Sequence, residues 1–154
     1  MMQKAFEVIT RLGGRTLATA ESCTGGGIGA ALTAVPGASR VYRGGIISYC
    51  NGVKQSLLGV APSVLLEDGA VSARTACAMA QGARSVLEAD IAVSVTGLAG
   101  PDGDESGHPV GTVFIGYADA GAVLSREFHF SGDRDAIRQQ AVDAALALIL
   151  AQNP

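Results

Sequence analysis

The chain has 154 residues, which is enough for one domain with a sizeable core and too few for two ordinary domains. With 48% hydrophobic and 16% charged residues, it has the composition of a globular protein and not of a disordered one. A net charge of −3 offers no basic field to a phosphate backbone, so nucleic-acid binding is disfavoured and small anionic ligands stay open.

The cysteines Cys23, Cys50 and Cys77 lie far apart, form no CxxC motif and are odd in number. This pattern argues against a disulfide framework or a zinc site and favours a reducing compartment. Glu7 falls where a secretory signal would need its apolar segment, and the longest apolar stretch, 144–151, is too short to span a bilayer. We therefore expect a cytoplasmic protein that contacts no membrane.

Apolar periodicity and turn signals predict helices that alternate with strands. In chain order we expect a helix over 5–12, a strand over 17–20, a helix over 28–35, a strand over 44–50, and short helices over 53–59 and 63–67. A helix capped by Ser72, a strand over 91–95, a hairpin of 110–118 with 122–130, and a helix capped by 131–133 follow. This order predicts one α/β domain over residues 1–154, a three-layer sandwich in which helices cover a mixed β-sheet.

Three loops at predicted strand ends are where a ligand would collect: 22–27, 49–54 and 96–103. The first is a glycine-rich turn between a strand and a helix, and it would offer backbone N–H groups to an anion or an oxyanion. The alternative is a plain helix cap made by Ser22 or Thr24. The chain has no GxGxxG and no GxxxxGK[ST] motif, and its two histidines predict no metal site.

Ser22 is the candidate nucleophile, and a serine needs a neighbouring base to take its proton. Lys54 lies among apolar residues, and burial would lower its pKa enough for the neutral form to act. The alternative is a lysine that faces solvent from a helix. Cys23 is a rival nucleophile that ranks below Ser22, because no motif places a histidine near it, and its alternative role is packing.

Seven segments, in order over nearly the whole chain, resemble the CinA C-terminal domain family. They are 20–26, 45–49 with Asn51 and Lys54, 58–60, 69–72, 97–103, 109–113 and 130–134. The one departure is Cys50, where the family pattern has a serine. That change would matter if the hydroxyl bonded the substrate.

The resemblance implies a nicotinamide-nucleotide amidase, which hydrolyses nicotinamide mononucleotide to nicotinate mononucleotide and ammonia in pyridine-nucleotide recycling. It implies a serine amidohydrolase with no metal and no organic cofactor. Ser22 would be the nucleophile, with Lys54 and Tyr49 as proton-handling partners, and which of the two touches Ser22 is open. Backbone N–H groups around Thr24, Gly25 and Gly26 would hold the oxyanion.

Further residues are expected to bind the nucleotide substrate and its phosphate. They are Asn51, the backbone of Gly97, Ala99 and Gly100, the Thr112 hydroxyl, and Arg134 or Arg138. The alternative for both arginines is the surface face of the last helix. By resemblance we also expect a homodimer.

The alternative function is a non-catalytic domain of the same fold that binds a nucleotide or a partner. The joint presence of Ser22, Tyr49 and Lys54 favours the amidase.

Overall fold

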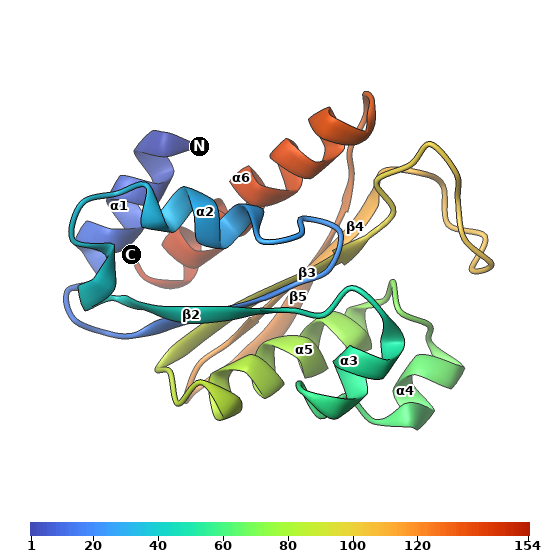
Figure 1. Ribbon diagram of the computed structural model, residues 1–154, viewed down its shortest axis with the longest axis horizontal. Coiled ribbons are helices and arrows are strands. Elements are labelled where there is room, and N and C mark those ends of the chain that lie inside the picture. The colour runs from blue at the N-terminus through green and yellow to red at the C-terminus, as the bar shows by residue number, and fades with distance from the viewer.

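Five strands form one sheet in the order β2-β1-β3-β4-β5 (Figure 1). In the computed structural model, which describes residues 1–154, β1 (Leu17–Glu21) lies between two parallel neighbours, β2 (Tyr42–Ile47) and β3 (Ile91–Gly97). The antiparallel hairpin of β4 (Thr112–Ala118) and β5 (Val123–His129) continues the sheet from β3. The predicted mixed sheet and the predicted hairpin are therefore confirmed.

Helices cover both faces of this sheet (Figure 1). On one face lie α1 (Met2–Leu12), α2 (Gly27–Thr33) and α6 (Arg134–Gln152), with a short 3₁₀ turn at Ala38–Arg40. On the other lie α5 (Ala73–Val86) and the short helices α3 (Asn51–Ser56) and α4 (Pro62–Glu67). The predicted α/β class is confirmed. None of the helices combines the length and the apolar character that crossing a bilayer requires.

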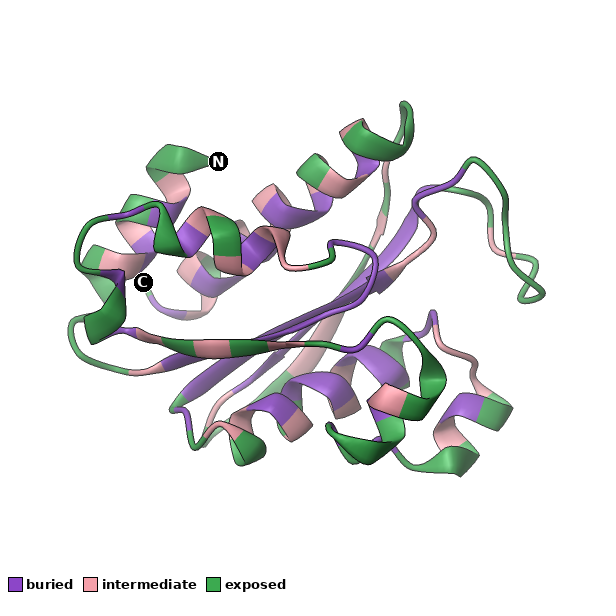
Figure 2. Cartoon of the chain, in the orientation of Figure 1, coloured by how far each residue is buried: buried purple, intermediate pink, exposed green.

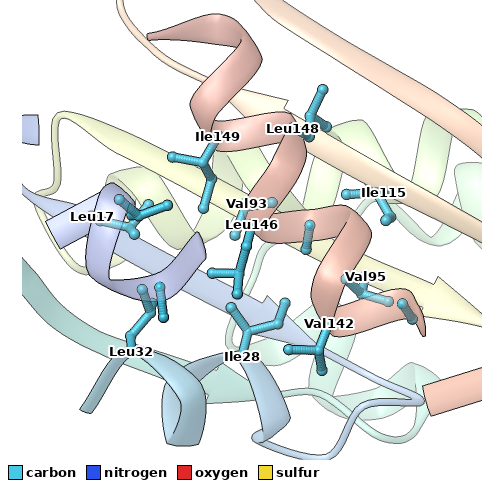
Figure 3. Packing of buried hydrophobic residues seen from close by; sticks show 14 of the residues in the cluster. Leu17, Ile28, Leu32, Val93, Val95, Ile115, Val142, Leu146, Leu148 and Ile149 are labelled. Atoms are coloured by element: carbon cyan, nitrogen blue, oxygen red, sulfur yellow. The ribbon is translucent and has the colours of Figure 1, made fainter. Parts of the chain in front are cut away.

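The core is split in two by the sheet, as expected for strands that are buried on both faces. All residues of β1 and β4 are buried, whereas β5 at the edge is largely exposed (Figure 2). The larger apolar cluster fills the space between the sheet and the α1, α2 and α6 layer, and Figure 3 shows Leu17, Ile28, Leu32, Val93, Val142 and Leu146 within it. A smaller cluster packs α5 against the opposite face, with Met79 and Ala83 on Ala18, Ala20 and Ala92.

The boundaries of β2 differ from the sequence prediction. The strand begins at Tyr42 and ends at Ile47, and residues 48–50, predicted as strand, lie outside it, although the Ser48 N–H still donates to the Glu21 carbonyl of β1 at 2.8 Å. The Ser48 carbonyl turns inward, where it accepts a hydrogen bond from the Lys54 ammonium group at 2.7 Å. A ladder cannot continue through a residue whose carbonyl serves a buried side chain, and α3 starts at once at Asn51. The predicted caps at Ser72 and Asp133 are confirmed by their side-chain hydrogen bonds to backbone N–H groups.

Candidate active site

Ser22 follows β1 directly and is held by the backbone on both sides. Its N–H donates to the Val95 carbonyl of β3 at 2.9 Å, and its own carbonyl accepts from the Gly25 N–H at 3.0 Å. Its side chain is buried apart from a small exposed fraction of 8%. The central strands therefore fix where the hydroxyl group lies, with little freedom for the main chain.

Glu21, the last residue of β1, caps the helix that follows. One carboxylate oxygen accepts from the Thr24 hydroxyl at 2.6 Å and from the N–H groups of Gly26 and Ile28 at 3.1 and 3.0 Å. The other oxygen accepts from the Gly29 N–H at 2.9 Å. A fully buried carboxylate is tolerated because these donors replace its water. The side chain of Glu21, and not an external anion, occupies the N-terminus of α2.

This cap differs from the prediction that Ser22 or Thr24 caps the helix. Gly26 is the N-cap residue and supplies no side chain. The N–H groups of Gly25 and Gly26 are also taken, by the Ser22 carbonyl and by Glu21, so they do not match the prediction of free oxyanion donors.

Lys54 is buried and points at the Ser22 hydroxyl. Its Nζ lies 3.0 Å from Ser22 Oγ and 2.7 Å from the Ser48 carbonyl oxygen, and only 1% of the residue is exposed. No carboxylate lies within ion-pair distance, and burial lowers the pKa of Lys54 from its usual 10.5. The solvent-facing alternative does not apply. A neutral Lys54 can accept the Ser22 proton across the same contact.

Cys23 has the environment of a packing residue. Its side chain lies in the larger apolar cluster, and burial, followed by the charge of Glu21, raises the pKa of the thiol to about 11. A thiol with this pKa stays protonated near neutral pH, whereas a nucleophilic cysteine needs the thiolate. The geometry thus favours Ser22 over Cys23.

We expect iodoacetamide at pH 8 to alkylate Cys50 in the folded protein and to leave Cys23 unmodified. Cys50 is exposed, whereas Cys23 is buried and its pKa is raised. Mass spectrometry of the peptides after brief labelling would measure both sites, with the unfolded protein as the control in which both react. Equal labelling of the two cysteines in the folded protein would contradict the packing role.

A cavity of about 260 Å³ opens beside Ser22 and Lys54. The three predicted loops and the first turn of α6 all contribute to its wall. Of the predicted site residues it brings together Ser22, Tyr49, Asn51, Lys54, Gly97, Ala99, Gly100 and Arg134.

Arg134 connects two walls of this cavity. Its guanidinium group donates to the Gly100 carbonyl at 2.6 Å and to the Tyr49 hydroxyl at 3.0 Å. Tyr49 is exposed and makes no hydrogen bond to Ser22 or Lys54, so Lys54 is the direct partner of Ser22. The N–H groups of Ala99 and Gly100 donate to no group of the chain and are free to bind a ligand at the cavity wall.

Five predicted site residues lie outside the cavity wall: Thr24, Gly25, Gly26, Thr112 and Arg138. Thr112 is fully buried, and its hydroxyl donates to the Pro109 carbonyl at 2.7 Å, so it cannot reach a phosphate. Arg138 donates instead to the carbonyls of Cys23 and Thr24, which lie in the 22–27 loop next to Ser22. These residues build the frame of the site, not its surface.

Comparison with known proteins identifies the family of this chain. The model of the CinA C-terminal domain matches residues 2–152. The chain belongs to the CinA C-terminal domain family. A CinA-like protein from Geobacter metallireducens is 51% identical over 125 residues, which are 81% of this chain and 30% of that protein. For a CinA-like protein from Thermosynechococcus vestitus the identity is 50% over 141 residues, 90% of this chain and 34% of that protein. The chain thus spans about a third of the length of these relatives.

Solved structures of the CinA family share the fold over nearly their whole length. The competence/damage inducible protein CihA from Agrobacterium tumefaciens is 40% identical, with a TM-score of 0.96 over 99% of this chain and 95% of that one. A CinA superfamily protein from Klebsiella pneumoniae is 34% identical, with a TM-score of 0.95 over 98% and 96%.

Three residues of this CinA domain that sequence reasoning left out contribute to the site. Glu21 caps α2, the Ser48 carbonyl holds Lys54, and Asp102 adds a carboxylate to the cavity wall. A signal for Glu21 was present, because a charge at the end of a buried strand needs donors, and the threonine and glycines that follow supply them. Nothing in the sequence indicates a carbonyl contact such as that of Ser48.

Proposed function

We propose that this protein is a nicotinamide-nucleotide amidase that hydrolyses nicotinamide mononucleotide to nicotinate mononucleotide and ammonia. The observation that carries the proposal is the buried Lys54 Nζ, 3.0 Å from Ser22 Oγ, at the wall of a cavity. A lysine buried beside a serine without a carboxylate partner costs stability unless it is used in its neutral form. This arrangement has the residue types and the distance that a Ser–Lys amidohydrolase requires.

The reaction follows from the two side chains. Ser22 Oγ attacks the amide carbon as its proton passes to Lys54 Nζ, which gives a tetrahedral oxyanion. The C–N bond then breaks, the Lys54 ammonium group gives the proton to the leaving nitrogen, and ammonia departs. A water molecule attacks the resulting ester of Ser22 while Lys54 takes its proton. The ester bond breaks, the proton returns to Ser22 Oγ, and the carboxylic acid product leaves.

The charges of the cavity support a nucleotide with its phosphate near Arg134. The guanidinium group and the free N–H groups of Ala99 and Gly100 provide donors, and Asp102 is the one carboxylate that lines the same cavity. A neighbouring hollow of about 830 Å³ shares Asn51 and Ala70 with the cavity. It carries the carboxylates of Glu67, Asp68, Asp104 and Glu105, which would repel a phosphate. The phosphate is therefore assigned to the Arg134 side.

Incubation of the purified protein with nicotinamide mononucleotide is expected to release one ammonia per nicotinate mononucleotide formed, measured by a coupled ammonia assay and mass spectrometry. Free nicotinamide, which lacks the ribose phosphate that Arg134 would hold, is the matched control and should react much more slowly. Binding of the nucleotide without ammonia release would overturn the amidase in favour of the non-catalytic binding domain. Equal rates on both compounds would overturn the nucleotide assignment.

A further inference from the structure

Arg138, in the second turn of α6, contacts the 22–27 loop that carries Ser22. Its Nε donates to the Cys23 carbonyl at 3.1 Å, and its Nη2 donates to the Thr24 carbonyl at 3.2 Å. The residues in these two contacts lie 115 and 114 positions apart in the sequence. Arg138 lines a separate hollow, together with Thr24 and Asp135, and is absent from the wall of the catalytic cavity.

Peptide geometry converts these carbonyl contacts into directions for N–H groups. In a trans peptide the C=O and N–H bonds point to opposite sides, so the Cys23 carbonyl that faces Arg138 turns the Thr24 N–H away from it. The Thr24 carbonyl that accepts from Arg138 likewise turns the Gly25 N–H toward the Ser22 carbonyl, and this hydrogen bond fixes the direction of the Cys23 N–H. Neither the Cys23 N–H nor the Thr24 N–H donates to any other residue of the chain.

We propose that Arg138 is a positioning residue that holds the 22–27 loop so that the free N–H group of Cys23, which borders the cavity beside Ser22, donates to the oxyanion formed there. The proposal rests on the proposed function, because it needs Ser22 to be the nucleophile. The N–H groups of Gly25 and Gly26 are already bonded and Thr24 lies outside the cavity wall, so Cys23 carries the free donor that borders the cavity next to Ser22.

A guanidinium group suits this task better than an ammonium group. Its planar fork meets two successive carbonyls at once, whereas a lysine would act as a single point charge. Its positive charge on the carbonyl side also polarises the peptide, which makes the N–H on the opposite side a stronger donor. Donors fixed in advance stabilise the transition state without a reorganisation cost at the moment of reaction.

The test uses diisopropyl fluorophosphate, because its reaction with Ser22 needs the same oxyanion donors and no nucleotide. Ser22 Oγ forms a bond to phosphorus, fluoride leaves, and the serine proton passes to Lys54. Peptide mass spectrometry identifies the labelled residue and measures the rate constant. We expect Arg138→Ala to lower this rate constant by about 10²-fold, with the midpoint of its pH profile unchanged because Lys54 is untouched.

Asp135→Asn is the matched control, since it removes the exposed 3.7 Å ion pair of Arg138 and leaves both carbonyl contacts in place. Its rate constant should stay within about twofold of wild type, as an exposed ion pair contributes little. Arg138→Lys should lose rate while folding normally, and it decides the matter if Arg138→Ala does not fold. Wild-type rates in the arginine variants, or a shifted pH midpoint with an unchanged plateau, would overturn the positioning role alone. If Ser22 of the wild type does not react with diisopropyl fluorophosphate at all, then Ser22 is not the nucleophile, and both the positioning role and the proposed function are overturned.

Discussion

Ser22→Ala is expected to lower the rate of ammonia release from nicotinamide mononucleotide by about 10⁴-fold or more, as in other hydrolases that lose their nucleophile. The variant lacks the oxygen that attacks the amide carbon, and the neighbouring Cys23, although it also lines the cavity, cannot replace it because burial raises the pKa of its thiol to about 11. Steady-state ammonia release at saturating nucleotide would measure the loss. A decrease of less than about tenfold would place the nucleophile elsewhere.

Ser48→Ala is the matched control for this experiment. The Ser48 hydroxyl is buried and has no hydrogen-bond partner, whereas the Ser48 carbonyl, which the substitution keeps, holds Lys54. Removing an unsatisfied buried hydroxyl is close to neutral or stabilising. The Ser48 variant should therefore keep its activity, and both variants should retain the wild-type melting temperature. Loss of activity in both variants would mean that the site tolerates no change at either serine, and it would not identify Ser22 as the nucleophile.

Lys54→Met is expected to lower ammonia release by about 10³-fold or more while the protein stays folded, because the base is gone and the methionine fills the same apolar space. Replacing a buried cation that has no acidic partner by an apolar side chain removes a desolvation cost, so the melting temperature should hold or rise. Circular dichroism and the ammonia assay would measure the two effects. A folded Lys54→Met variant with wild-type activity would exclude Lys54 as the base.

The pH dependence of the wild type provides an independent check on Lys54. Burial lowers the pKa of Lys54 in the folded protein below the 10.5 of the unfolded chain, and only the neutral amine accepts a proton. Activity should therefore rise with pH and reach a plateau at a midpoint below 10.5.

Stability follows the same linkage. Between the folded and the unfolded pKa the unfolded chain binds more protons, so the free energy of unfolding rises with pH across that window. The difference between wild type and Lys54→Met isolates this contribution from other titrating groups. An unchanged difference across the window would contradict the lowered pKa.

The fold was predictable because its helices and strands have local sequence signals, namely apolar periodicity and helix caps. Ser72 and Asp133 sit where caps were expected, and the sheet has the predicted mixed character. These features depend on residues within a few positions of one another, where periodicity and capping preferences are informative. The apolar neighbours of Lys54 left open whether it is buried or faces solvent from a helix, and the structure buries it.

The parts that could not be predicted depend on contacts between distant residues. The sequence predicted Thr112 and Arg138 as phosphate ligands. In the structure the Thr112 hydroxyl donates to the Pro109 carbonyl, and the Arg138 guanidinium group donates to the 22–27 loop. Which of Tyr49 and Lys54 meets Ser22 depends on where β2 leaves the sheet, and that in turn depends on the Ser48 carbonyl. Backbone acceptors have no signature in a sequence, because every residue carries one.

The tether between the Ser22 N–H and the Val95 carbonyl has a consequence for synthesis on the ribosome. A nascent chain that ends just past Lys54 already carries both members of the Ser–Lys pair, but it lacks the strand that accepts the Ser22 N–H. The helix that carries Arg134 and Arg138 emerges later still. Because domains complete their long-range contacts only once the distant segment is available, truncated products hold the reactive side chains without their alignment. Translation thus completes the frame around the Ser22–Lys54 pair only after α6 has been made.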